Sequence, residues 1–249
     1  MTTNIFDGHA CVMATDSRWS IRHGDWLLYL DDTNYQKIER SHGKALMFAG
    51  FGGKIQEWKN WIRSNPADDS GMPEFKGVSV CMVDESTHEV DMTDEKYYIN
   101  NNVYCAGSGK ELAYGCWLVN KSSKQAVETA KSKDFCSGGD VKFIDFKNSE
   151  TNLVNFYPEA EPTIEKVSLA IAQRGISMKL STQSAPILPF SKADAAASEE
   201  AVVLAEIAGL VANGQLSADA PCDGMHDDWS EENKAKFKAA LGKMFGWKN

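Results

Sequence analysis

The predicted strands and helices of this 249-residue chain follow one another in an order that limits its possible fold classes. Apolar residues at helical spacing predict an amphipathic helix over residues 54–63. Later in the chain, two helices follow one another directly over residues 110–120 and 123–134, the second with Ser123 as its predicted N-cap. Strands surround these helices, so the sequence predicts an α+β fold with helices layered on antiparallel sheets. The predicted strands span residues 2–6, 10–15, 26–30, 35–40, 44–49, 77–83, 88–92, 141–146 and 153–157.

The last part of the chain differs in kind from the rest. Residues 158–162 contain two prolines that interrupt the strand pattern, and mainly helical patterns follow them. Asp194 and Ser230 are predicted N-caps, and the final helix places an apolar stripe on one face that we expect to dock on the chain's own core. The sequence thus predicts one domain over residues 1–158 and a helical extension over residues 159–249 packed on it. Predicted here are helices over residues 163–172, 195–212 and 227–247, an extended stretch over 185–190, and the stripe Phe237, Leu241, Met244 and Phe245.

Composition and charge exclude several classes of function. The net charge of -9 argues against nucleic-acid binding, which draws on clustered Lys and Arg. No run approaches the ~20 apolar residues that span a bilayer, and no basic segment followed by an apolar core suggests a signal peptide. The six cysteines and five histidines show no metal-ligand spacing. We therefore expect no metal, no cofactor and no membrane partner, and the scattered cysteines predict reduced thiols of a cytoplasmic protein.

Two glycine-serine signatures carry the clearest chemistry. Residues 107–115 read Gly-Ser-Gly-Lys-Glu-Leu-Ala-Tyr-Gly, and residues 134–139 read Asp-Phe-Cys-Ser-Gly-Gly. Each glycine-rich turn sets a small hydroxyl beside bare backbone, which suits a site where a peptide must approach closely. The first signature is not a phosphate-binding loop, because that motif needs another Gly where Tyr104 stands and a Ser or Thr where Glu111 stands. No nucleotide site is predicted.

Together with the N-terminal threonines, Asp16-Ser17-Arg18 and Lys37, these signatures resemble the proteasome β-subunit family over roughly the first 150 residues. The resemblance implies a four-layer αββα sandwich, the N-terminal nucleophile hydrolase fold. It also implies that Thr2 is the nucleophile once Met1 is removed, with its α-amine as general base. The site residues that the resemblance implies are Thr2, Asp16, Lys37, Ser108, Asp134 and Ser137 as catalytic residues, Gly50 as oxyanion hole and Phe48 as lining of the substrate pocket.

Two interpretations of function stay open. The first is an N-terminal-threonine amide hydrolase, a proteasome β-type peptidase, that takes a peptide or amide substrate. The second is a protein of the same fold that has lost catalysis and serves as a binding or structural subunit. The presence of Lys37 together with Asp16 favours the enzyme, since a scaffold has no need of that pair. The segment from Thr2 to Asp16 is shorter than in the family, which favours the scaffold. Family members commonly form rings, so a homo-oligomer is a further expectation.

Overall fold

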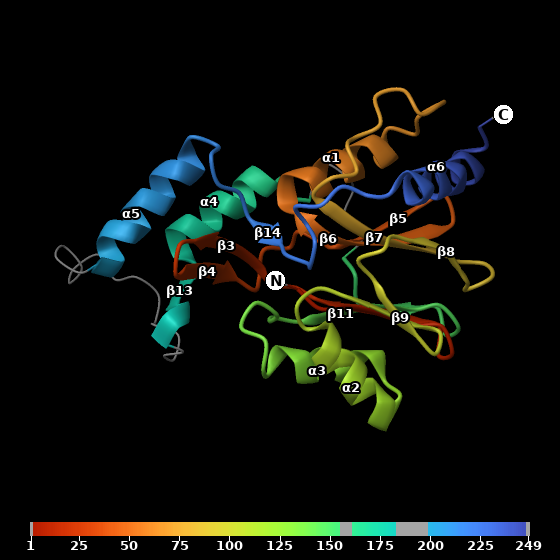
Figure 1. Ribbon diagram of the computed structural model, residues 1–249, viewed down its shortest axis with the longest axis horizontal. Coiled ribbons are helices and arrows are strands. Elements are labelled where there is room, and N and C mark those ends of the chain that lie inside the picture. The colour runs from red at the N-terminus through yellow and green to blue at the C-terminus, as the bar shows by residue number, and fades with distance from the viewer. Residues whose placement is uncertain (1, 155–160, 183–198, 248–249) are drawn as a thin grey trace.

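The computed structural model describes residues 2–154, 161–182 and 199–247, which form two antiparallel sheets with helices on their outer faces (Figure 1). The predicted mixed α+β class with antiparallel sheets is confirmed. The strands are β1 Asn4–Asp7, β2 Val12–Asp16, β3 Trp19–His23, β4 Trp26–Leu30, β5 Ile38–Ser41, β6 Lys44–Phe51, β7 Val78–Asp84, β8 Val90–Thr93, β9 Tyr98–Asn100, β10 Val103–Ala106, β11 Val141–Asp145, β12 Glu150–Thr151, β13 Ile176–Lys179 and β14 Asp219–Ala220. The helices are α1 Gly52–Arg63, α2 Lys110–Asn120, α3 Ser123–Lys131, α4 Ile164–Arg174, α5 Glu199–Ala212 and α6 Glu231–Phe245, with a 3-10 turn at Leu180–Thr182.

The first sheet has six strands in the order β12-β11-β2-β1-β10-β9. Successive side chains of a strand point to opposite faces, and β1 shows the consequence. Ile5 packs in one cluster with Trp117 of α2 and Val127 of α3, whereas the next residue, Phe6, packs in another cluster with Met47 of β6. One face of this sheet is therefore covered by α2 and α3, and the other face packs against the second sheet (Figure 1).

The second sheet has eight strands, with the path β13-β4-β3-β14-β6-β7-β8 and β5 paired to β6. In β6, Met47 faces the first sheet, while Phe48 faces the opposite way into the largest core cluster. Helices α1, α4 and α6 supply Trp58, Ile171 and Phe237 to that cluster. These helices cover the outer face of the second sheet, as Figure 1 shows.

The part of the chain after residue 160 enters the second sheet as well as covering it. Strand β13 pairs with β4, and β14 lies between β3 and β6. The prediction of a helical extension missed these two strands. Side chains of Phe237, Leu241 and Met244 in α6 are buried in the main core cluster, as expected for a docked stripe.

Several element boundaries differ from the predicted ones. Ser122, and not Ser123, caps α3 by accepting a hydrogen bond from the Gln125 N–H at 3.3 Å. Strand β3 was not predicted, although Trp19 and Ile21 alternate with polar residues. Residues 155–157 of one predicted strand, the extended stretch 185–190 and the Asp194 cap lie outside the described residues.

Replacing Phe237 with alanine tests how firmly α6 is docked. The ring is 1% exposed and lies 5.3 Å from the Trp58 ring and 5.5 Å from the Trp229 ring, centroid to centroid. We expect Phe237→Ala to lower the free energy of unfolding by about 3–5 kcal/mol, measured by guanidinium denaturation. The neighbouring exposed Lys238→Ala is the control and should change it by less than about 0.5 kcal/mol. Equal, small effects of both variants would show that α6 is not held by this cluster.

Candidate active site

Glycines 107 and 109 let the N-terminal segment lie directly against the turn before α2. A Cβ on Gly107 would lie 1.8 Å from the Thr2 carbonyl oxygen, and one on Gly109 would lie 1.9 Å from the Thr3 hydroxyl oxygen. Gly107 also has a φ of +88°, which residues with a side chain rarely adopt. The Gly-Ser-Gly sequence is therefore explained by close backbone approach, and it fixes where Thr2 lies.

Thr2, Asp16 and Lys37 form one hydrogen-bonded group. The Thr2 hydroxyl donates to the Asp16 carboxylate, and the Lys37 ammonium donates to the Thr2 hydroxyl oxygen at 2.6 Å. The same Lys37 nitrogen lies 3.0 Å from Asp16 Oδ1, so it contacts both partners. All three residues are buried, with at most 2% of Lys37 exposed. A hydroxyl, a carboxylate and a cation thus meet at one point in the interior.

Strand ends and backbone donors fix the Asp16 carboxylate. Asp16 is the last residue of β2, and its two oxygens accept hydrogen bonds from three backbone N–H groups. Those of Thr3, Gly138 and Arg18 lie 2.8, 3.1 and 3.2 Å away. The carboxylate therefore cannot rotate without losing several bonds, and this holds it in place to orient Lys37.

Burial controls the charge on Lys37. Desolvation lowers the pKa of the Lys37 ammonium, and the nearby Asp16 carboxylate opposes that effect only in part. Arg18 adds a further lowering of this pKa through its own positive charge. An ammonium with a lowered pKa is a stronger hydrogen-bond donor, so Lys37 suits stabilising negative charge on the Thr2 oxygen.

Ser108, Asp134 and Ser137 form a second hydrogen-bonded group beside the first. Both serine hydroxyls donate to Asp134 Oδ2, at 2.5 Å from Ser108 and 2.6 Å from Ser137. The Ser137 oxygen also lies 2.7 Å from the Thr3 hydroxyl oxygen. The predicted residues are thus brought together as two groups, and the Thr3 backbone and side chain connect them because its N–H binds Asp16.

Gly50 and Phe48 lie on β6 beside this site. Gly50 has a φ of +129°, and a Cβ there would lie 2.2 Å from the Gly77 carbonyl oxygen, so this position near the end of β6 needs glycine. The Phe48 side chain is completely buried in the main core cluster with Trp19 and Tyr35. An open pocket therefore does not reach Phe48 in this structure, and its role in substrate binding stays a prediction.

Three structural features at the site were not predicted from the sequence. Thr3 connects the two hydrogen-bonded groups. Its place directly after Thr2 in the sequence was the signal that could have pointed to it. Arg18 pairs with Asp31 through two hydrogen bonds at 2.7 and 2.9 Å. The Thr2 N–H donates to the carbonyl oxygen of Pro221 at 3.1 Å, a contact between distant segments that no local pattern announces.

Replacing Gly107 with alanine should disturb both the site and the fold. The new Cβ would meet the Thr2 carbonyl oxygen, and the positive φ adds strain, so we expect a loss of about 2–4 kcal/mol in the free energy of unfolding. Gly115→Ala, in the middle of α2 with open space around it, should be neutral or stabilising by up to about 1 kcal/mol. Thermal and denaturant unfolding of both variants would measure this, and equal effects would contradict the packing argument.

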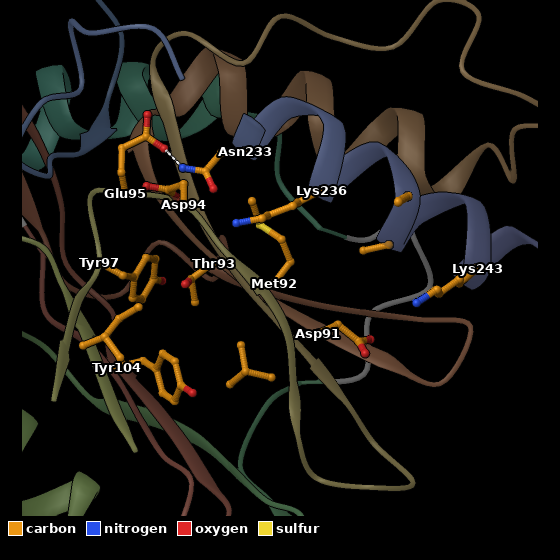
Figure 2. A pocket seen from close by; sticks show the side chains of 14 residues that line it. Asp91, Met92, Thr93, Asp94, Glu95, Tyr97, Tyr104, Asn233, Lys236 and Lys243 are labelled. Atoms are coloured by element: carbon orange, nitrogen blue, oxygen red, sulfur yellow. Dashed lines mark hydrogen bonds between the residues drawn. The ribbon is translucent and has the colours of Figure 1, made fainter. Parts of the chain in front are cut away.

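One cavity adjoins this site, and a larger one lies elsewhere in the fold. The first cavity, of about 180 Å³, is lined by Asp16, Lys37 and residues 31–36, so it reaches the site from the loop that precedes β5. A larger one of about 590 Å³ lies between β8 and α6 (Figure 2). Its buried carboxylate, Asp94, accepts bonds from the Ser79 hydroxyl and the Val80 N–H, which is a structural use of that group. The larger cavity therefore does not carry the chemistry.

Within residues 2–154, 161–182 and 199–247, no three His, Cys, Asp or Glu side chains cluster in a way that could hold a metal ion. The helices of this described part are each too short or too polar to cross a membrane.

Comparison with known proteins gives structural neighbours only. No protein-family model and no curated protein sequence matches the chain. Thiobacillus denitrificans BPH in complex with epoxomicin is 14% identical with a TM-score of 0.39, covering 58% of this chain and 97% of that one. A second structure of Thiobacillus denitrificans BPH is 15% identical with a TM-score of 0.35, covering 58% and 96%. Eukaryotic HslV from Trypanosoma brucei is 16% identical with a TM-score of 0.29, covering 57% and 97%.

These neighbours are proteasome-type threonine peptidases. At such identities and with TM-scores below 0.5, the likeness does not decide the activity, which has to be argued from the site itself. In structure, the chain resembles proteasome-type threonine peptidases over somewhat more than half of its length.

Proposed function

We propose that this protein is an N-terminal-threonine amide hydrolase of the proteasome β type, with Thr2 as the nucleophile. The single observation that carries the proposal is the position of the Lys37 ammonium, 2.6 Å from the Thr2 hydroxyl oxygen and 3.0 Å from Asp16. A buried lysine is costly unless it has a use or a partner, and here its partners are a carboxylate and a hydroxyl that can act as a nucleophile.

The residues have the following proposed roles. Removal of Met1 frees the Thr2 α-amine, whose reference pKa of ~7.7–8.0 suits a general base at neutral pH. The Thr2 oxygen bonds to the substrate's carbonyl carbon, its proton passes to the base and then to the leaving amine, and the C–N bond breaks. Water then hydrolyses the resulting ester and restores the hydroxyl. Lys37 stabilises the developing alkoxide, and Asp16 holds Lys37 in position.

The surrounding groups have supporting roles in this proposal. Ser108, Asp134 and Ser137 orient the N-terminal segment through Thr3 and the freed amine. The Gly50 N–H serves as oxyanion donor, and Phe48 lines the substrate pocket once the pocket is open. Two sheets facing each other with helices outside support assignment to the four-layer αββα sandwich of N-terminal nucleophile hydrolases. We further propose a domain over residues 1–158 with residues 159–249 packed on it, and assembly as a homo-oligomer in the cytoplasm.

A second candidate is a catalytically inactive protein of the same fold that acts as a binding or structural subunit. It is favoured by the complete burial of Thr2 and by the hydrogen bond from the Thr2 N–H to the Pro221 carbonyl oxygen. A nucleophile covered in this way cannot meet a substrate unless the covering segment moves.

Intact-mass measurement and hydrolysis of peptide amides separate the two candidates. The hydrolase requires a protein lighter by one methionine, time-dependent cleavage, and a covalent adduct with epoxomicin, the compound found in complex with one neighbour. A protein that retains Met1 quantitatively, cleaves no peptide and reacts with no such electrophile would favour the inactive subunit.

A further inference from the structure

Residues 216–222, named the strap below, cover the candidate nucleophile. The strap contains β14, in which Asp219 pairs with Ser20 of β3 and with Phe51 of β6. Figure 1 shows β14 lying between these two strands, close to the N-terminal end of the chain. The Thr2 N–H donates to the Pro221 carbonyl oxygen within the strap at 3.1 Å. Thr2 has no exposed surface in this arrangement.

The strap closes a short gap in the second sheet between β3 and the end of β6. Among the described residues, β3 and β6 are connected through the two-residue β14. Without it, residues 50–51 of β6 and Ser20 of β3 would lose their partner on these edges, whereas β5 pairs with residues 44–47 on the rest of that β6 edge. An extended peptide can add to such edges through main-chain hydrogen bonds. The gap therefore has the geometry of a slot for an extended peptide, and the chain's own segment occupies it.

Small side chains and a few polar contacts hold the strap against the rest of the chain. Ala218 and Ala220 are completely buried, and the Ala218 N–H donates to the Ser168 hydroxyl at 2.8 Å. A Cβ on Gly52 would lie 2.0 Å from the Ala218 carbonyl oxygen, so the strap lies directly on the start of α1. Leu216 packs against the main core cluster and Cys222 packs with Ala49, so apolar contacts hold the strap together with its polar ones.

Burial disfavours the charged form of the Asp219 carboxylate in the strap. This carboxylate accepts a hydrogen bond from the Gly52 N–H at 2.9 Å, yet burial raises the pKa of Asp219 to about 6. Release would return this carboxylate to water and regain its hydration. Upstream of the strap, α5 ends at Ala212, and downstream the chain is anchored again at the buried Met225 and Trp229, so release would involve the segment between these points.

We propose that the strap is an autoinhibitory segment of this chain: it occupies the peptide slot between β3 and β6, and its release opens that slot and exposes Thr2. The identity of the slot as a substrate site rests on the proposed hydrolase function. The occupancy of the slot by the strap, and its exchange with a peptide added in solution, do not require any chemistry at Thr2.

Three variants test the strap: one that loosens it, one that keeps its hydrogen bond, and one that locks it. Asp219→Ala removes the acceptor for the Gly52 N–H and should loosen the strap, whereas Asp219→Asn keeps an acceptor oxygen without the buried charge. Ser20→Cys with Asp219→Cys can lock it, because the Cα atoms of paired antiparallel residues lie at ~4.5–5.5 Å, within disulfide range. The lock can be opened by reductant, so it tests the strap even if Asp219→Ala folds poorly.

The first readout is hydrogen exchange of the strap amides, with those of α6 as internal reference. The second is anisotropy of a labelled peptide with the strap sequence Leu-Ser-Ala-Asp-Ala-Pro-Ser, in which serine replaces the final cysteine. We expect Asp219→Ala to speed strap exchange and to tighten peptide binding, each on the order of ten-fold or more. In Asp219→Asn, strap exchange should be as slow as in the wild type or slower, and peptide binding as weak or weaker. The oxidised lock should bind no peptide until it is reduced.

The outcomes separate this proposal from the hydrolase. Peptide binding equal in the oxidised and reduced lock, or strap exchange in Asp219→Ala as slow as in α6, would overturn the strap proposal. Strap release and peptide binding without any reaction of Thr2 toward an electrophile would support the strap and contradict the hydrolase. If Thr2 reacts equally fast with the lock closed and open, the hydrolase would be supported and the strap proposal would be contradicted.

Discussion

Replacing Thr2 with alanine is expected to abolish hydrolysis, with a fall in kcat of at least about 10⁴-fold, because the nucleophile is lost. Lys37→Met should approach the same loss, since its ammonium touches the Thr2 oxygen and Asp16. The double variant should be hardly worse than Thr2→Ala alone, because residues that act as a unit are not additive. Steady-state cleavage of a peptide amide by each variant measures this.

The control for this series is Thr2→Ser, which keeps a hydroxyl at the same position and should retain activity. Each measurement is best repeated in the Asp219→Ala background, so that a closed strap does not hide turnover. Hydrolysis by Thr2→Ala at the wild-type rate would remove Thr2 from the mechanism.

Replacing Asp16 with alanine is expected to give the largest loss of stability at the site. The Lys37 ammonium would be left buried with no carboxylate beside it, and the N–H groups of Thr3, Arg18 and Gly138 would lose their acceptor. Removing one partner of a buried ion pair costs about 3–5 kcal/mol, and we expect a loss of that size. Chemical denaturation, with the slope checked against the wild type, measures it.

Lys37→Met provides the matched comparison for Asp16→Ala. It also breaks the ion pair, but it leaves Asp16 with its three backbone donors, so we expect a smaller loss of about 1–3 kcal/mol. An Asp16→Ala protein as stable as the wild type would mean that the buried pair contributes nothing to holding the N-terminal segment.

Local patterns predicted those elements whose structure is determined locally. Helix α1, predicted over residues 54–63, spans Gly52–Arg63, and α2 lies within its predicted bounds. In both, apolar spacing and the preceding glycine turn carry the signal. The two glycine-serine signatures likewise pointed to residues that the structure brings together, because close approach to backbone demands glycine wherever it occurs.

The strap could not be predicted in the same way. Strand β14 comprises only Asp219 and Ala220, neither of which favours strands, and Pro221 follows them. Its conformation comes from β3 and β6, whose residues lie far away in the sequence. The same limit applies to Phe48, whose position on β6 was evident but whose burial depends on helices from the distant C-terminal part.

The most direct test of the central claim is mass spectrometry of the protein after reaction with an electrophile specific for N-terminal threonine. The strap-loosened Asp219→Ala variant is the best starting material. The proposed mechanism predicts a chain that lacks Met1 and carries one adduct, located on Thr2, with no adduct in Asp219→Ala combined with Thr2→Ala. A chain that retains Met1 and carries no adduct, or an adduct on another residue, would contradict it.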